Sequence, residues 1–283
     1  MNELDNLAYF LNSIKETLPF KDENDFAKKI KQSKEFRIKV QKLVYLSKYF
    51  GWNNSYHFNF HERGPYSLQL SEDYHNISSF DKENKSFKIN EEFNEFLLKD
   101  NEYLESITSL LYYANALDLS KISKEDAITN LRIIKPHISR KTISKSYDTI
   151  KKFNLFNCKI EKSKFNNINS YEKIVMDKSK GMIHIFENYE ISSNRLFLLG
   201  TLDYFRLVFE NGGNENLELL NRLYDYAEKV EKEYFKYHPK NVELKDMNLS
   251  MLKDEFNDLQ NYVSENLKII PKLDENTDLS FFF

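Results

Sequence analysis

The stretch from Phe36 to Ser67 limits the possible folds of this chain more than any other part of the sequence does. Apolar residues recur at helical spacing over 35–50, and most residues between them are basic or carry amides. Aromatic and polar residues then alternate over 56–61, which is the period-two pattern of a strand. Gly64-Pro65 breaks that strand, and helical spacing returns over 66–79. The sequence therefore predicts a helix, a short strand, a tight turn and a second helix.

Scarce turn residues extend the helical prediction to most of the chain. Only 6 Gly and 5 Pro occur in 283 residues, which disfavours a turn-rich all-β fold. We expect a mainly α protein with a small β component. Apolar spacing and capping residues predict further helices over 3–18, 22–30, 91–98, 103–117, 123–134, 139–153, 192–210, 215–236 and 248–268.

Composition changes along the chain predict two domains. Residues 1–157 form a helical domain with winged-helix-like features, in which the polar stretch 81–90 takes the place of the wing. The Asn-, Ser- and Lys-rich stretch 158–170 is the expected linker, and 171–273 form an acidic helical domain that opens with a hairpin over 174–186. Residues 274–283 are expected to be a flexible C-terminal tail.

Charge is distributed unevenly between the two halves. Residues 1–164 hold 27 basic and 23 acidic side chains, whereas 165–283 hold 14 and 21. The basic excess is concentrated in 21–50 and 135–164, and it is open to two interpretations. The helix faces are either merely solvated, or they contact the phosphates of DNA or RNA. The nucleic-acid interpretation assigns phosphate contacts to Arg37, Lys39, Lys42, Lys48, Arg140, Lys141 and Lys145. Helical spacing places Arg37, Lys39, Gln41, Lys42 and Lys48 on or beside the solvent face of the 35–50 helix.

Sequence motifs for enzyme chemistry are absent. No nucleophile elbow, phosphate-binding loop, dinucleotide fingerprint or zinc-deaminase signature occurs. His57, His61 and His75 lack the spacing of metal ligands, and a single cysteine, Cys158, excludes an internal disulfide or a cysteine-cluster zinc site. We therefore expect no catalytic residue, no metal and no cofactor, although a site assembled from scattered residues stays open.

Targeting signals are also missing from the sequence. Residues 1–20 lack a basic segment followed by an apolar run, and no window of about 18 uncharged apolar residues exists. A cytoplasmic protein with no membrane span is expected.

The final residues carry a short motif of their own. Leu279-Ser280-Phe281-Phe282 resembles the bacterial sliding-clamp-binding pattern QLSLF, without its glutamine. Shifted by one residue, Leu279, Phe282 and Phe283 resemble the archaeal and eukaryotic pattern QxxLxxFF, with Asn276 in place of glutamine. Aromatic anchors of this kind fill a hydrophobic pocket on a partner. Clamp recruitment therefore competes with docking of the tail on this chain or on a partner subunit.

Three short words connect the first half to a known group of proteins. The words are QKLVYL at 41–46, GPYS at 64–67 and LRIIKPHIS at 131–139. Over roughly 30–155 the chain resembles the YwgA-like and Panacea (SocA-like antitoxin) families. That resemblance implies a binding module whose protein partner is a toxin or a phage-defence effector. It places the docking point at Gln41, Tyr45, Arg63 and Tyr66. The alternative is that the residues around the Gly-Pro turn only hold the strand against the helix.

Two functions follow as hypotheses. The first is a non-enzymatic, antitoxin-like or defence-linked regulator that acts by protein–protein binding. The alternative is a DNA- or RNA-binding regulator that uses the basic helices over 35–50 and 139–153 and is recruited to a sliding clamp by the tail. Self-association as a homodimer is open in both.

Overall fold

A computed structural model describes residues 3–15, 18, 20–52, 54–77, 90–117, 122–158, 160, 173–178, 197, 200–201, 204–205, 207–208, 211, 216–237 and 250–267. The chain divides into two units, residues 1–164 and residues 165–283. Each unit is described separately below.

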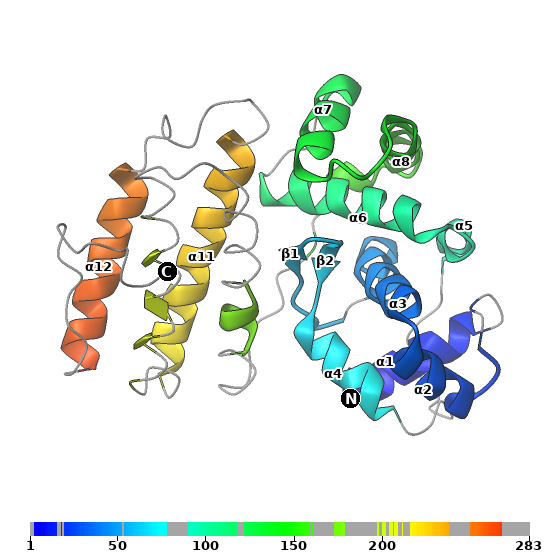
Figure 1. Ribbon diagram of the computed structural model, residues 1–283, viewed down its shortest axis with the longest axis horizontal. Helices are drawn as coiled ribbons and strands as arrows, with labels where there is room; N and C mark the ends of the chain where they lie inside the picture. Colours follow the sequence, from blue (N-terminus) through cyan, green and yellow to red (C-terminus); the bar gives the residue numbers. More distant parts are fainter. Residues whose placement is uncertain are drawn as a thin grey trace. The chain divides into compact units, whose positions relative to one another are not determined.

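The first unit is mainly helical with one small antiparallel sheet, as the sequence predicted (Figure 1). Its elements, in chain order, are α1 (Glu3–Ile14), α2 (Glu23–Gln32), α3 (Lys34–Ser47), η1 (Lys48–Phe50), β1 (Asn59–His61), β2 (Gly64–Tyr66), α4 (Leu68–Asn76), η2 (Glu91–Phe93), α5 (Asn94–Leu97), α6 (Asn101–Ala116), α7 (Lys124–Ile134), α8 (Arg140–Lys152) and η3 (Leu155–Asn157).

Short polar side chains begin several of these helices. The side chains of Asp22, Ser33, Ser123 and Ser139 each accept a hydrogen bond from a backbone N–H in the first turn of α2, α3, α7 and α8, respectively. Each such cap stabilises its helix by about 1 kcal/mol. Gly51, at φ 88°, follows η1 as its C-terminal cap. Local capping chemistry therefore accounts for the agreement between predicted and observed helix starts.

The α6 helix is the centre of the first unit, and α3, β2, α7 and α8 all pack against it. Every residue from Tyr103 to Ala114 is buried. A helix surrounded in this way must bury polar residues as well as apolar ones, and Glu105, Ser106 and Ser109 are among them. The helix itself was predicted, but not the burial of its carboxylate.

The sheet differs from the sequence prediction in extent. β1 begins at Asn59, so the strand is shorter than 56–61, and it pairs antiparallel with β2 so that Phe60 lies opposite Pro65. Gly64-Pro65 does not end the β structure but begins its second strand, because Gly64 at φ 80° turns the chain back. α4 then starts at Leu68, later than predicted. The expected wing over 81–90 lies almost wholly outside the described residues.

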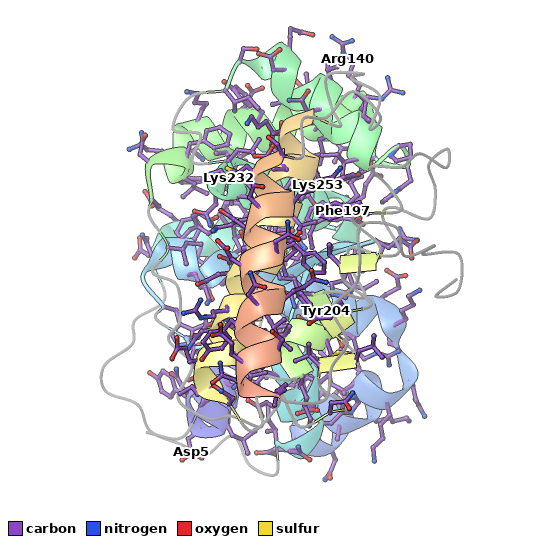
Figure 2. The ribbon with its side chains drawn as sticks, turned by 90° about the vertical axis from the view of Figure 1, so that its left-hand side faces the viewer. Asp5, Arg140, Phe197, Tyr204, Lys232 and Lys253 are labelled. Atoms are coloured by element: carbon purple, nitrogen blue, oxygen red, sulfur yellow. The ribbon has the colours of Figure 1, made fainter. Side chains whose placement is uncertain are left out.

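The second unit contains α11 (Leu217–Tyr237) and α12 (Ser250–Asn266), close to the predicted bounds. The two helices pack together. The ring of Phe256 on α12 lies 5.8 Å from Phe197 and 5.3 Å from Tyr204, both labelled in Figure 2.

The hairpin expected over 174–186 is wrong in its first strand. Residues 173–178 are helical, and Ile174, Val175 and Lys178 are buried along this segment. The Lys178 ammonium lies 2.9 Å from Glu231 on α11, so the segment contacts α11 through a buried ion pair. The rest of the predicted hairpin, most of the linker and the tail over 274–283 fall outside the described residues.

Truncation of Leu104 tests the placement of α6. Leu104→Ala removes a fully buried side chain, and the resulting cavity should lower the free energy of unfolding by about 2–5 kcal/mol. Leu98→Ala is the matched control, because Leu98 is 79% exposed, and it should change stability by less than about 0.5 kcal/mol.

Urea unfolding followed by the fluorescence of Trp52 measures both variants. Trp52 is the single tryptophan, it lies in the first unit, and its ring stacks on Phe10 at 4.1 Å. Equal losses of stability in the two variants would contradict the central position of α6.

Candidate functional site

The hairpin between β1 and β2 presents an exposed tip on a buried base. Glu62 and Arg63 form the tip, with side chains 63% and 47% exposed. Behind them, Gly64 lies so close to α6 that a Cβ at that position would stand 2.6 Å from Ser109 Oγ. The base of the hairpin therefore admits only glycine at this point. Residues 61–67 are called the clamped turn below.

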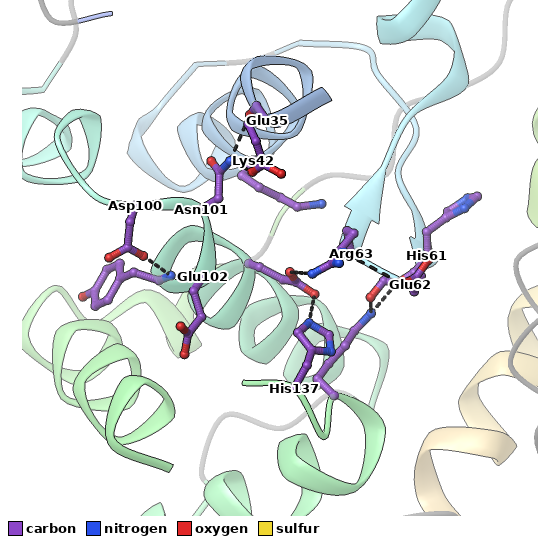
Figure 3. Close-up of polar contacts among 12 residues, drawn as sticks. Glu35, Lys42, His61, Glu62, Arg63, Asp100, Asn101, Glu102 and His137 are labelled. Carbon is purple, nitrogen blue, oxygen red and sulfur yellow. Dashed lines mark hydrogen bonds and ion pairs between the residues drawn. The ribbon is translucent and has the colours of Figure 1, made fainter. Parts of the chain in front are cut away.

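Two buried lysines reach the backbone of the clamped turn. Lys42 of α3 donates to the carbonyl of Pro65 at 2.6 Å. Lys135, which follows α7, donates to the carbonyls of His61 and Glu62 (Figure 3). Both lysines are only 2% exposed. Buried carbonyls need a partner, and these two side chains supply it from different helices.

Gln41 completes the hold on the turn. Its amide accepts from the N–H of Ser67 and donates to the carbonyl of Ser67, both at 2.9 Å. This paired contact imitates the hydrogen bonding of a neighbouring strand. Three side chains therefore fix the backbone of the clamped turn at its start and at its end.

Glu105 of α6 provides the negative charge at this site. Its carboxylate accepts from His137 Nε2 at 2.9 Å and lies 3.9 Å from Arg63 Nη1. Its side chain is 4% exposed, whereas those of His137 and Arg63 are 38% and 47% exposed. In Figure 3, dashed lines join the labelled side chains of Arg63 and His137 to this one carboxylate. The buried acid thereby connects the interior of the unit to the surface beside the turn tip.

Burial sets the protonation of both lysines. It lowers the pKa of Lys42 to about 7; the charge of Glu105 opposes that shift and the charge of Lys135 adds to it. Burial likewise lowers the pKa of Lys135 to about 7, opposed by Glu105 and Glu62 and assisted by Arg63. Near neutral pH the site therefore exchanges protons, and the amine form can still donate its hydrogen bonds.

The predicted solvent face of α3 is wrong for two residues. Gln41 and Lys42 are each 2% exposed and point into the unit rather than away from it. Tyr45, predicted to contact a partner, is 4% exposed, with its hydroxyl 3.1 Å from that of Tyr49. The reason is that α2, α6 and β2 surround α3, so it has little free surface.

The other residues of 35–50 that were predicted to contact nucleic acid are also partly buried or hydrogen-bonded within the first unit. Arg37 donates to the carbonyl of Ile30 at 2.6 Å, at the end of α2. Lys48 donates to the carbonyl of Tyr56 at 2.6 Å, and burial lowers its pKa to about 8. Burial also lowers the pKa of Lys39.

Residues predicted elsewhere are placed as follows. Arg63 and Tyr66 lie on the clamped turn, and the Tyr66 ring is 4.9 Å from His61. On α8, Lys141 and Lys145 are exposed, and Arg140 lies 2.7 Å from Glu125. Leu279, Phe282 and Phe283 lie outside the described residues. The structure thus brings together Gln41, Lys42, Arg63 and Tyr66 and leaves the α8 cations apart from them in sequence and contact.

Sequence reasoning missed Glu105, Lys135 and His137. The signal for Glu105 is a single acid inside an otherwise apolar and small-residue run, Leu104 to Ala114, because a buried acid requires a cation. Lys135 and His137 flank Pro136 in the word LRIIKPHIS, and neither was assigned to the predicted docking point. Their separation along the sequence conceals that all three belong to one site.

Comparisons with known proteins add no relative. The chain matches no family model, no curated protein and no solved structure. Within the described residues, no group of three or more histidine, cysteine, aspartate or glutamate side chains could hold a metal ion. None of the helices described is both long and apolar enough to cross a membrane.

Alanine at Gly64 tests the close approach of the clamped turn to α6. Gly51→Ala is the matched control, because Gly51 has φ 88° but no atom within 4 Å of a Cβ. Both variants carry the strain of a left-handed alanine, roughly 1–2 kcal/mol, and Gly64→Ala should lose more because of its contact with Ser109. Urea unfolding monitored by Trp52 fluorescence measures both losses, and a Gly64→Ala loss no larger than the control would refute the contact.

The buried lysines predict a pH-dependent stability. Their pKa falls from 10.5 in the unfolded chain to about 7 in the folded one. Between these values the unfolded chain binds more protons, so the stability of the first unit should rise with pH across about 7 to 10.5 and level off below about 7.

The double variant Lys42→Met, Lys135→Met should lose most of that rise, because methionine does not titrate. Lys48 remains in both proteins, so the difference between them isolates the pair. Urea midpoints at several pH values from about 6 to 9 give the two slopes, each buried lysine contributing at most about 1.4 kcal/mol per pH unit. Identical slopes would show that the pair does not titrate in this range.

Proposed function

We propose that this protein is a non-enzymatic regulator that acts by binding another protein, in the manner of an antitoxin or a defence-linked regulator. The clamped turn is the recognition element, and its partner is a toxin or a defence effector. The proposal is based on the hydrogen bonds by which three buried side chains, those of Gln41, Lys42 and Lys135, fix the backbone of the turn.

The free-energy cost of burying charged side chains around the turn supports a binding role. Transferring two lysines and a glutamate out of water carries a penalty of several kcal/mol per ion, which only good geometry offsets. A connection between two short strands does not need such groups, since turn residues alone can form it. A turn fixed before binding loses little conformational entropy when a partner docks, and this raises affinity.

The chemistry of the tip points the same way. Arg63 and Tyr66 are of the residue types enriched among binding hot spots. They lie on one turn, with Glu62 exposed beside Arg63. The resemblance of 30–155 to the YwgA-like and Panacea families, carried by QKLVYL, GPYS and LRIIKPHIS, also favours a protein partner.

Nucleic-acid binding receives less support from the contacts of its assigned residues. Lys42 is buried, Lys48 holds the carbonyl of Tyr56, and Arg140 is paired with Glu125. Backbone recognition needs several exposed cations facing the phosphates together. Of the assigned residues, Arg140, Lys141 and Lys145 are exposed, and all three lie on α8.

Co-expression with the product of the adjacent gene tests the proposal. The wild-type chain should neutralise or co-purify with that protein, and nuclease treatment should leave the complex intact. Glu62→Trp places a bulky ring on the tip of the turn and should weaken co-purification roughly tenfold or more, as expected of a central interface position. Glu125→Trp, at a position whose side chain is 73% exposed on α7, is the matched control and should bind as wild type does.

Two outcomes would contradict the proposal. One is a neighbouring product that is neither toxic nor bound; the other is a complex that nuclease dissolves, which would favour the nucleic-acid alternative. A protein complex equally affected by both tryptophan variants would remove the clamped turn from the interface.

A further inference from the structure

We infer that Arg63 and His137 together form a docking point for a carboxylate side chain of the protein partner. This inference rests on the proposed function and names the chemistry that the partner must bring. Both residues lie at the surface, and both contact the same buried carboxylate, Glu105.

The guanidinium of Arg63 has donors to spare. Its contacts are two long ion pairs, 3.8 Å to Glu62 and 3.9 Å to Glu105, and it makes no hydrogen bond to any described residue. Arg140 and Arg222, by contrast, donate to carboxylates at 2.7 and 2.9 Å. A guanidinium fork matches a carboxylate in bidentate geometry. Arg63 therefore has guanidinium N–H groups that can donate to an incoming carboxylate.

His137 is oriented for the same ligand. The carboxylate of Glu105 fixes the ring through Nε2 at 2.9 Å, and Nδ1 makes no hydrogen bond to a described residue. The side chain is 38% exposed, so an incoming group can reach it. In the imidazolium form the ring offers an Nδ1–H donor in addition to those of Arg63.

Arg63 is the exposed cation of the charged set around the turn. Lys42 and Lys135 are buried and donate to backbone carbonyls. An incoming carboxylate can therefore reach the guanidinium of Arg63 but not the two amines.

The same surroundings disfavour an extended polyanion. Glu62 is 63% exposed beside Arg63, and Glu102 interacts electrostatically with His137. A chain of phosphates would meet these acids, whereas one side chain can enter between them. The site thus suits an acidic residue of a protein better than a nucleic-acid backbone.

An acidic peptide tests the site without the partner. The probe is the peptide acetyl-Gly-Gly-Glu-Gly-Gly amide, which carries a single carboxylate, with acetyl-Gly-Gly-Gln-Gly-Gly amide as its neutral control; each is titrated into the full chain while the ring resonances of His137 are followed by NMR. The glutamate peptide should shift these resonances saturably, and the glutamine peptide should not. Arg63→Met keeps the aliphatic stem but removes the charge, and it should weaken binding roughly fivefold or more. Arg140→Met, which removes an exposed cation of α8, is the matched control and should leave the affinity within about twofold.

Three results would overturn the inference: no saturable shift with the glutamate peptide, equal weakening in the two methionine variants, or tighter Arg63-dependent binding of a single-stranded oligonucleotide. Failure here differs from failure of the proposed function. If the adjacent gene product is bound but Arg63→Met has no effect on either ligand, the docking point is wrong and the regulator stands. If the peptide binds as expected but no protein partner is found, the carboxylate site stands without the proposed function.

Discussion

Burial of Lys42, Lys135 and Glu105 against one turn is the interaction on which the first unit depends. Any one of these charges alone inside a protein would be strongly destabilising. Together they compensate, because the amines hold backbone carbonyls while the carboxylate lowers the electrostatic cost of both. Their helices and loop lie far apart in the sequence, so the cluster also decides how α3, α6 and the connection from α7 to α8 meet. Loss of Glu105 would leave both lysines without the carboxylate that opposes their charge.

This interior arrangement has a consequence at the surface. Inside the unit, the carboxylate of Glu105 is attracted electrostatically to Lys42 and Lys135. At the surface, the same carboxylate contacts His137 and Arg63. Preorganised donors bind with less entropic cost than free side chains. In the proposed function, fold stability and recognition would therefore share one set of residues.

The helices were predictable from the sequence because local chemistry determines them. Helical spacing with Asp22, Ser33, Ser123 and Ser139 as caps places α2, α3, α7 and α8 within a few residues. The buried polar site was not predictable in the same way. An amphipathic pattern assigns a lysine to water, but the long stem of Lys42 carries its amine through the interior to a carbonyl. No local signal gives the distance between segments, so Glu105 and Lys135 could not be matched to it in advance.

The three words that carry the family resemblance meet in space. In the first word, Gln41 and Lys42 bond the backbone of Ser67 and Pro65, which belong to the second word. In the third word, Lys135 bonds the carbonyl of His61 at the start of the turn. His137, also in the third word, contacts the buried carboxylate of Glu105 on α6. Each word is therefore needed for the others: a turn without the lysines would leave carbonyls unpaired, and the lysines without the turn would be buried without acceptors. Glu62 and Arg63, at the exposed tip of the turn, lie outside the three words. In the proposed function, the choice of partner would therefore depend on these two residues.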